Sequence, residues 1–183
     1  MIIIAIVIIG FLIIVIVGVY WQNRAPLEPE ITYGEFPFRF EYEIDGERFV
    51  IEDTIIAEFE RSVRGDMTTQ AARRWQTTLM NNEGDNDPLG GSGFLLREKE
   101  DITIIFNPGF ATYFMGDIDA GIRGRSENNN DVRSGPNITV RNPNFTPILT
   151  TIRVEDAHEL LAEHGIILIS WEYTPPVENS FGD

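Results

Sequence analysis

The sequence contains no cysteine, two histidines and a single lysine, Lys99. The absence of cysteine excludes disulfides, thiol nucleophiles and thiolate metal sites together. His158 and His164 are six positions apart, so they do not form the i, i+4 pair with which one helix face presents two metal ligands. No motif names a reaction or a ligand, and we expect no cofactor.

Positive charge is also scarce. The chain has 14 Lys and Arg residues against 29 Asp and Glu residues, which gives a net charge of -15. The arginines are scattered along the sequence, and no basic stripe is present that would neutralise phosphates, so nucleic acid is excluded as a partner. We expect anionic lipid headgroups to repel the chain as well, apart from a contact with Arg24.

The N-terminus, by contrast, carries a long hydrophobic run. Residues 2–19 contain no charged or strongly polar side chain. As a helix they would span about 27 Å, close to the roughly 30 Å hydrocarbon core of a bilayer. Tyr20 and Trp21 follow at the place where aromatic side chains meet the membrane interface. We therefore predict a transmembrane helix over residues 1–21, with residues 2–21 in contact with the lipid bilayer.

A cleaved signal peptide is the main alternative for this run. Such a peptide needs basic residues before the apolar core and small residues before the cleavage site. The sequence has neither, so we predict an uncleaved signal-anchor. Residues 22–30 follow as a short tether, which Pro26 and Pro29 make stiff.

A β-hairpin is the clearest element beyond the tether. Apolar and charged side chains alternate from Phe38 to Ile44, which is typical of a half-buried strand. Asp45 and Gly46 form a preferred two-residue type I′ turn. Pairing across this turn brings aromatic and apolar side chains together on one face and opposite charges on the other. The expected pairs are Ile44 with Glu47, Glu43 with Arg48, Tyr42 with Phe49, Phe40 with Ile51 and Arg39 with Glu52.

Weaker patterns follow the hairpin. We expect its second strand to continue through Phe59, with a bend or bulge at Asp53. Ala71, Trp75 and Leu79 lie at i, i+4 and i+8 behind Thr68, which predicts a short helix. Residues 81–93 are rich in Gly, Asn and Asp and predict a flexible loop.

The second half of the chain alternates strands with polar segments. We predict strands over residues 94–99, 102–107, 110–115, 137–142, 146–152 and 166–171. A type II turn at 107–109, a long loop over 116–137 and an amphipathic helix from Val154 that Gly165 ends complete the pattern. The fold class is therefore mainly β (α+β), an antiparallel sheet or sandwich with one or two short helices. The globular domain is expected over residues 31–174, with a loose tail over 175–183.

Three segments resemble one family. They are ITYGEFPF at residues 31–38, YFMGD at 113–117 and LISWE at 168–172. They are similar to an uncharacterised family of small proteins of Gram-positive, clostridia-like bacteria that carry an N-terminal membrane or lipoprotein segment. The resemblance covers about residues 31–181. The resemblance implies an envelope location, and it brings no assigned activity with it. The lipid-attachment cysteine of some such proteins is missing here, so the helix would have to anchor the chain.

Two acidic groups are the metal candidates. One alternates as the first ligands of a calcium loop do, but proline stands where the loop needs glycine and no glutamate occupies the twelfth position. A weak calcium site and solvated loop carboxylates are the two interpretations. The candidates are Glu83, Asp85 and Asp87 in the first group, and Asp117 and Asp119 in the second.

We expect a membrane-anchored, non-catalytic binding or accessory module on the extracytoplasmic side of the plasma membrane, with envelope proteins or glycans as partners. A small envelope hydrolase that uses paired carboxylates is one alternative. A cytoplasm-facing subunit of a membrane complex is the other. Arg24 alone would favour a cytoplasmic C-terminus, but long domains translocate largely regardless of charge. The resemblance to the lipoprotein-like family favours the outward orientation.

Overall fold

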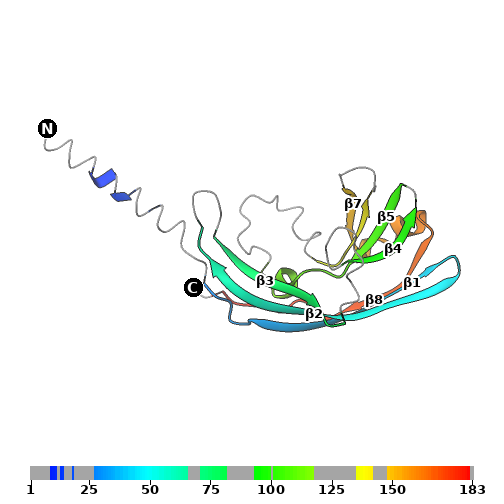
Figure 1. The fold of residues 1–183 in the computed structure, drawn as a ribbon, viewed down its shortest axis with the longest axis horizontal. Coiled ribbons are helices and arrows are strands. Elements are labelled where there is room, and N and C mark those ends of the chain that lie inside the picture. The colour runs from blue at the N-terminus through cyan, green and yellow to red at the C-terminus, as the bar shows by residue number, and fades with distance from the viewer. Residues whose placement is uncertain are drawn as a thin grey trace.

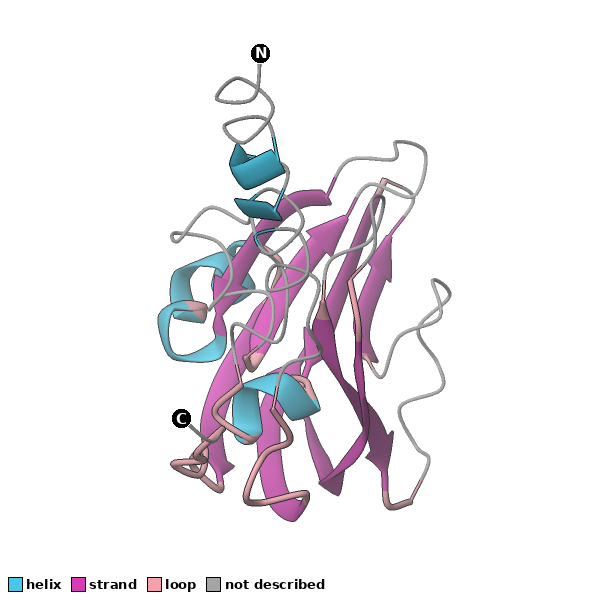
Figure 2. Cartoon of the chain, turned by 90° about the vertical axis from the view of Figure 1, so that its left-hand side faces the viewer, coloured by secondary structure: helices cyan, strands magenta, loops and turns pink. Residues whose placement is uncertain are grey.

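Two antiparallel sheets make up most of the protein in a computed structural model (Figures 1 and 2). The structure describes residues 9–11, 13–14, 18, 27–65, 71–81, 93–99, 101–117, 135–141 and 148–181. Sheet A has the order β3-β2-β1-β8, and sheet B has the order β4-β5-β6-β7. The mainly β prediction is confirmed, and the two sheets are consistent with the predicted sandwich.

Sheet A is built on the predicted hairpin. β1 (Tyr33–Ile44) and β2 (Glu47–Val63) pair in the predicted register, from Ile44 opposite Glu47 to Arg39 opposite Glu52. Asp45 and Gly46 both have positive φ, 54° and 84°, as a type I′ turn requires. The second strand is long, as predicted, but the bulge at Asp53 is wrong. Asp53 stays in register opposite Phe38, and the irregularity lies between Phe59 and Arg61.

The predicted helix around Trp75 is wrong. Residues Ala72–Leu79 form strand β3, which pairs with β2 at the edge of sheet A. A spacing of four residues is one helical turn, but it is also two repeats of a strand. Arg74, Gln76 and Thr78 are exposed between half-buried or buried neighbours, which is the alternation of a strand. The long free edge of β2 offers the backbone of this segment hydrogen-bond partners, whereas an isolated helix of this length would be marginal.

Sheet B follows the predicted strands. It contains β4 (Phe94–Lys99), β5 (Ile102–Asn107), β6 (Asn137–Arg141) and β7 (Ile148–Arg153). The strand predicted over 110–115 is wrong, because Ala111–Phe114 form the short helix α2. Gly109 has a φ of 106°, and its N–H donates to Asn107 Oδ1, so the turn at 107–109 is present but leads into a helix.

The late helix is shorter than predicted and precedes the last strand. A 3-10 turn, η1 (Val154–Asp156), leads into α4 (His158–Glu163), and Gly165 follows with a φ of 72°. β8 (Ile166–Tyr173) then pairs with β1. The tail was expected to be loose. Instead, Val177 N–H donates to the Phe114 carbonyl, and Asn179 exchanges two hydrogen bonds with the backbone of Ile31.

The core has two halves because sheet B covers only part of sheet A (Figure 1). Toward the hairpin turn, Phe40 and Phe38 of sheet A pack on Phe106 and Phe94 of sheet B. Toward the chain entry, Phe36 packs on Phe114 of α2, with ring centroids 4.8 Å apart. Strand β1 of the hairpin therefore supplies side chains to both halves of the core.

The predicted membrane anchor lies mostly outside the described residues. Ile9–Phe11, Ile13, Ile14 and Gly18 are helical, and the four large apolar side chains among them are exposed. Within the described residues, no helix is long and apolar enough to cross a bilayer. The anchor over residues 1–21 therefore stays a prediction.

Gly46→Val is expected to lower the free energy of unfolding by more than about 1 kcal/mol, because a β-branched residue resists positive φ. Nothing lies within 4 Å of the added Cβ position, so the cost would come from the backbone and not from a clash. Urea unfolding measures the change. Glu47→Val, one residue on and with ordinary strand geometry, is the control, and equal midpoints for the two variants would contradict the prediction.

Candidate functional site

The waist of sheet A is the place where both edge strands end. β3 runs beside β2 from Ile55 to Val63, and β8 runs beside β1 from Phe38 to Ile44, so the two edge strands flank opposite halves of the sheet. Between these halves, Thr54 lies opposite Pro37. Thr174 N–H donates to the Pro37 carbonyl where β8 ends, and Met80 N–H donates to the Thr54 carbonyl where β3 ends.

This arrangement explains a proline in a central strand. Proline has no N–H and is normally confined to edges, strand ends and bulges. Here Pro37 faces the point at which β8 leaves the sheet, so the neighbouring strand requires no donor from it. Pro37 therefore marks the position where β8 ends. The chain leaves sheet A after β8 on one side and after β3 on the other.

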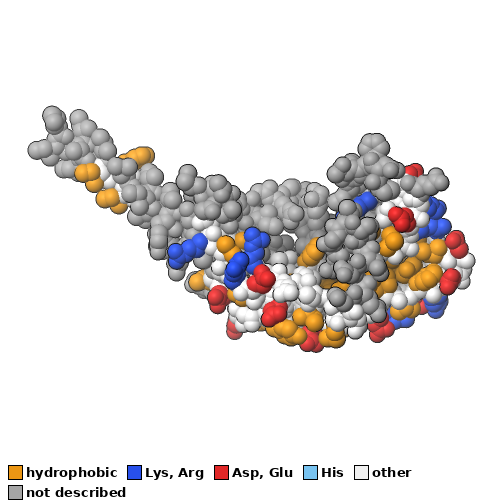
Figure 3. All heavy atoms as spheres, in the orientation of Figure 1, with side chains coloured by type: hydrophobic (Ala, Val, Ile, Leu, Met, Phe, Trp, Pro, Cys, Tyr) orange, Lys and Arg blue, Asp and Glu red, His pale blue; other side chains and the backbone are white. Residues whose placement is uncertain are grey.

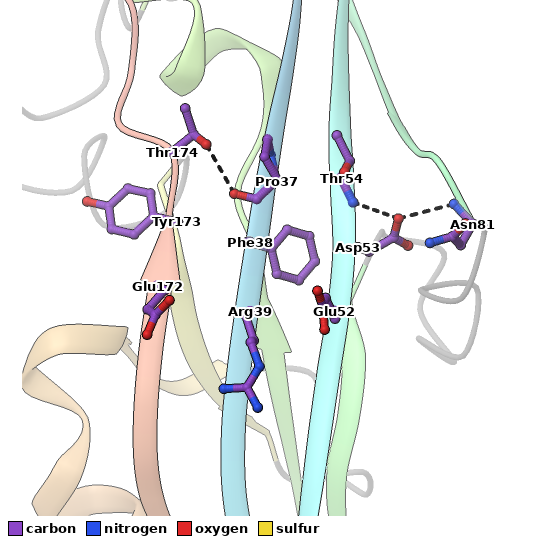
Figure 4. A pocket seen from close by; sticks show the side chains of 10 residues that line it. All are labelled: Pro37, Phe38, Arg39, Glu52, Asp53, Thr54, Asn81, Glu172, Tyr173 and Thr174. Atoms are coloured by element: carbon purple, nitrogen blue, oxygen red, sulfur yellow. Dashed lines mark hydrogen bonds between the residues drawn. The ribbon is translucent and has the colours of Figure 1, made fainter.

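A groove of about 490 Å³ occupies the waist (Figure 4). It is shallow and open, and polar side chains of β1, β2 and β8 dominate its lining. The residues that line it are Pro37, Phe38, Arg39, Glu52, Asp53, Thr54, Asn81, Glu172, Tyr173 and Thr174.

Arg39 lies at the centre of the groove, between two exposed glutamates. Its cross-strand partners are Glu52 of β2 and Glu172 of β8. Arg39 Nη1 donates to Glu41 Oε2 at 2.6 Å. That hydrogen bond raises the pKa of Arg39, and the charges of Glu41, Glu52 and Glu172 act in the same direction, against the effect of burial. The Arg39 guanidinium therefore stays positively charged, and it already forms an ion pair with Glu41.

Glu41 is held from a second side. Arg48 Nη1 lies 3.1 Å from its other oxygen, Oε1, and the Glu41 side chain is only 10% exposed. Because Glu41 is bound by two arginines, it is unavailable to a ligand. Glu52 and Glu172, in contrast, form no ion pair with any residue that the structure describes, and both side chains are exposed.

Asp53 forms the inner wall of the groove and is 4% exposed. Its Oδ1 accepts hydrogen bonds from Thr54 N–H at 2.7 Å and Asn81 N–H at 3.1 Å (Figure 4). These bonds fix the point at which the chain leaves β3. Its Oδ2 is buried and receives no hydrogen bond from any residue that the structure describes. Asp53 alternates with Glu52 along β2 and lies opposite Phe38, so its carboxylate is on the face of sheet A that packs on the core.

The groove has more negative than positive charge available. Glu52 and Glu172 flank one guanidinium that Glu41 already binds, while Thr54 and Thr174 add hydroxyl groups. This suits a ligand group that carries a positive charge and several hydrogen-bond donors. Glu52 and Glu172 are both exposed, with Arg39 between them.

The metal candidates are distributed differently. Glu83, Asp85, Asp87 and Asp119 lie outside the described residues. Asp117 is 2% exposed, and its two oxygens accept hydrogen bonds from Arg73 at 2.6 and 2.7 Å and from Trp75 Nε1 at 2.8 Å. Its carboxylate is therefore engaged by protein donors. Among the described residues, no group of three or more metal-ligating side chains occurs.

Sequence reasoning found part of the groove. The pair of Arg39 with Glu52 was predicted from the hairpin register, whereas Glu172 and Thr174 were not connected with it. The signal that could have joined them is Pro37, because a proline inside a strong strand pattern indicates that a neighbouring strand ends beside it.

Comparisons with known proteins give no further guide to the site. No family model, curated protein or solved structure matches the chain. The resemblance of residues 31–181 to the clostridia-like family therefore stays a prediction.

Proposed function

We propose that this chain is a membrane-anchored, non-catalytic binding module that presents the waist groove to a cationic ligand outside the cytoplasm. The observation that carries the proposal is the groove itself, in which Glu52 and Glu172 flank Arg39 on one exposed face of sheet A. Support for anchoring comes from the hydrophobic run over residues 2–19, and the resemblance supports an envelope location.

The ligand class follows from the charges. A primary amine or guanidinium on an envelope protein or glycan would contact Glu52 and Glu172, while threonine hydroxyls would accept or donate further hydrogen bonds. Because the groove is shallow and exposed, binding would be weak for a single group and would depend on salt.

Binding of a labelled pentalysine peptide tests the groove by fluorescence anisotropy. We expect Glu52→Gln with Glu172→Gln to weaken binding by about tenfold, as expected when charge-assisted hydrogen bonds are lost. The matched control is Glu58→Gln with Glu60→Gln, which removes two exposed charges from β2 away from the groove. If both double variants weaken binding equally, the effect comes from the net charge of the chain and not from the groove, which would overturn the proposed site.

Anchoring and orientation need a separate measurement. The chain has no cysteine, so Glu47→Cys would introduce a unique thiol beside the hairpin turn. Labelling of intact cells with a membrane-impermeant maleimide is expected for a domain outside the cytoplasm. Labelling only after lysis would place the domain in the cytoplasm. Release of the full chain from membranes by alkaline carbonate would contradict the predicted transmembrane anchor.

A further inference from the structure

Three exposed arginines gather at the end of sheet A where the chain enters the domain. Arg61 of β2 lies directly opposite Arg74 of β3, and Arg64 follows at the end of β2. We call Arg61, Arg64 and Arg74 the arginine end. Figure 3 shows Lys and Arg side chains grouped there, at the end of the domain where β2 ends and β3 begins in Figure 1.

The pairing of Arg61 with Arg74 is unfavourable within the chain. Like charges directly opposite each other across an antiparallel pair repel. None of the ion pairs between described residues includes an arginine of the arginine end. Arg73, the other arginine of this segment, differs because it is bound to Asp117 and lies over the Phe181 ring. The arginine end therefore carries positive charge that forms no ion pair with a described side chain.

The segment is also a local exception to the charge of the chain. Residues 61–74 contain four arginines and one aspartate, while the whole chain has a net charge of -15. The nearest glutamates of β2, Glu58 and Glu60, precede this segment on the side of the sheet centre. Because the chain is acidic as a whole, an anionic surface would attract the arginine end and repel most of the rest of the domain.

The chain entry brings this end to the predicted membrane. Phe59 N–H donates to the Thr32 carbonyl, so residues 61–64 extend beyond the start of β1. Glu30 N–H donates to the Ser180 carbonyl, and Ser180 Oγ donates to Glu30 Oε2, which fixes the tether at the same end. Between Trp21 and Leu27 the chain spans at most about 20 Å. The arginine end is thus the part of the domain that the tether holds near the bilayer.

We propose that the arginine end docks on anionic phospholipid headgroups and sets the orientation of the domain on the membrane. The proposal rests on the membrane anchor of the proposed function. It reverses the expectation from sequence, in which scattered arginines offered lipid no contact beyond Arg24. With the arginine end on the headgroups, the waist groove and the hairpin turn would lie farther from the bilayer, open to a ligand.

Energy transfer in reconstituted vesicles tests the docking. The full chain carrying Gln76→Cys, beside Arg74, is labelled with a donor, and a headgroup-labelled lipid is the acceptor. We compare vesicles of phosphatidylcholine with vesicles in which a quarter of the lipid is phosphatidylglycerol. Transfer is expected to rise by about twofold with anionic lipid at low salt and to fall at high salt. A donor at Glu47→Cys, at the opposite end, is expected to show no such rise.

Variants separate charge from folding. The triple variant Arg61→Gln, Arg64→Gln and Arg74→Gln should lose the dependence on anionic lipid, whereas the same three positions changed to Lys should keep it. Arg48→Gln, an exposed arginine beside the hairpin turn, is the matched control and should also keep it. A rise that persists in the triple Gln variant would overturn the proposal.

The experiment distinguishes this proposal from the anchor. A chain that floats with both vesicle types but shows the same transfer in each would overturn the docking and leave the anchor standing. If the chain floats with neither vesicle type, both the predicted anchor and the proposed docking are wrong.

Discussion

Asp117→Asn is expected to lower the free energy of unfolding by about 3–5 kcal/mol, the usual cost of removing one partner of a buried ion pair. The Arg73 and Asp117 side chains are 14% and 1% exposed, with Nη2 and Oδ1 only 2.6 Å apart. The amide keeps the shape of the carboxylate but leaves the guanidinium without a counter-charge. Urea unfolding of the chain from Leu27 onward measures the change.

A double variant tests whether the cost comes from the unpaired charge. Arg73→Met with Asp117→Leu removes both charges and should recover most of the loss, because a buried pair is often replaceable by apolar side chains. Trp75 Nε1 would lose its acceptor, so a deficit of about 1–3 kcal/mol should remain. Arg74→Met is the control, since this exposed neighbour should change stability by less than about 0.5 kcal/mol. A similar small change for Asp117→Asn would contradict the prediction.

The same ion pair connects the tail to the sheet. The guanidinium carbon of Arg73 lies 4.2 Å from the centre of the Phe181 ring, and Val177 N–H donates to the Phe114 carbonyl, three residues before Asp117. Loss of Asp117 should therefore free the C-terminal residues first. Faster proteolysis between Thr174 and Phe181 than elsewhere would show this local release.

The hairpin could be predicted because its information is local. Residues 38–52 contain the turn, the alternation and the charge pairs that fix the register, and each signal agrees with the others. The same holds for β4, β5 and β8, where short apolar runs end at polar residues. In these segments the sequence pattern and the tertiary environment favour the same structure.

Elements that depend on distant partners were not predictable in this way. β3 is a strand because β2 extends far enough to pair with it, and α2 replaces an expected strand where Ala111 N–H donates to Thr77 Oγ1. The tail is ordered by hydrogen bonds to residues about 150 positions away, such as the pair of Ile31 with Asn179. No local pattern records such contacts.

The waist groove and the arginine end have the same origin. Glu52 and Glu172 meet at Arg39 only because β1 has β2 on one side and β8 on the other. Arg61 and Arg74 meet because of the β2–β3 register, although 13 positions separate them in a sequence where the arginines look scattered. Charged clusters on an antiparallel sheet can therefore be predicted only when the strand pairing and register are known.

Phe40→Ala is the second large effect that we expect, a loss of about 3–5 kcal/mol in the free energy of unfolding. Phe40 is fully buried, and its ring stacks on Phe106 with centroids 4.3 Å apart and an interplanar angle of 14°. Trp171 packs edge-on against both rings. Truncation to alanine removes the side chain of sheet A that lies at the centre of this cluster.

The effect should fall on the contact between the sheets. In the described part of the chain, hydrogen-bonded pairing stays within sheet A or within sheet B, so side chains such as Phe40 and Phe106 hold the layers together. Near-ultraviolet circular dichroism from Trp171 should weaken in Phe40→Ala, while the far-ultraviolet β signal changes less. Val50→Ala, on the exposed face of the same strand pair, should lower stability by no more than about 0.5 kcal/mol. If Val50→Ala and Phe40→Ala cost the same, the rings are not what joins the two sheets.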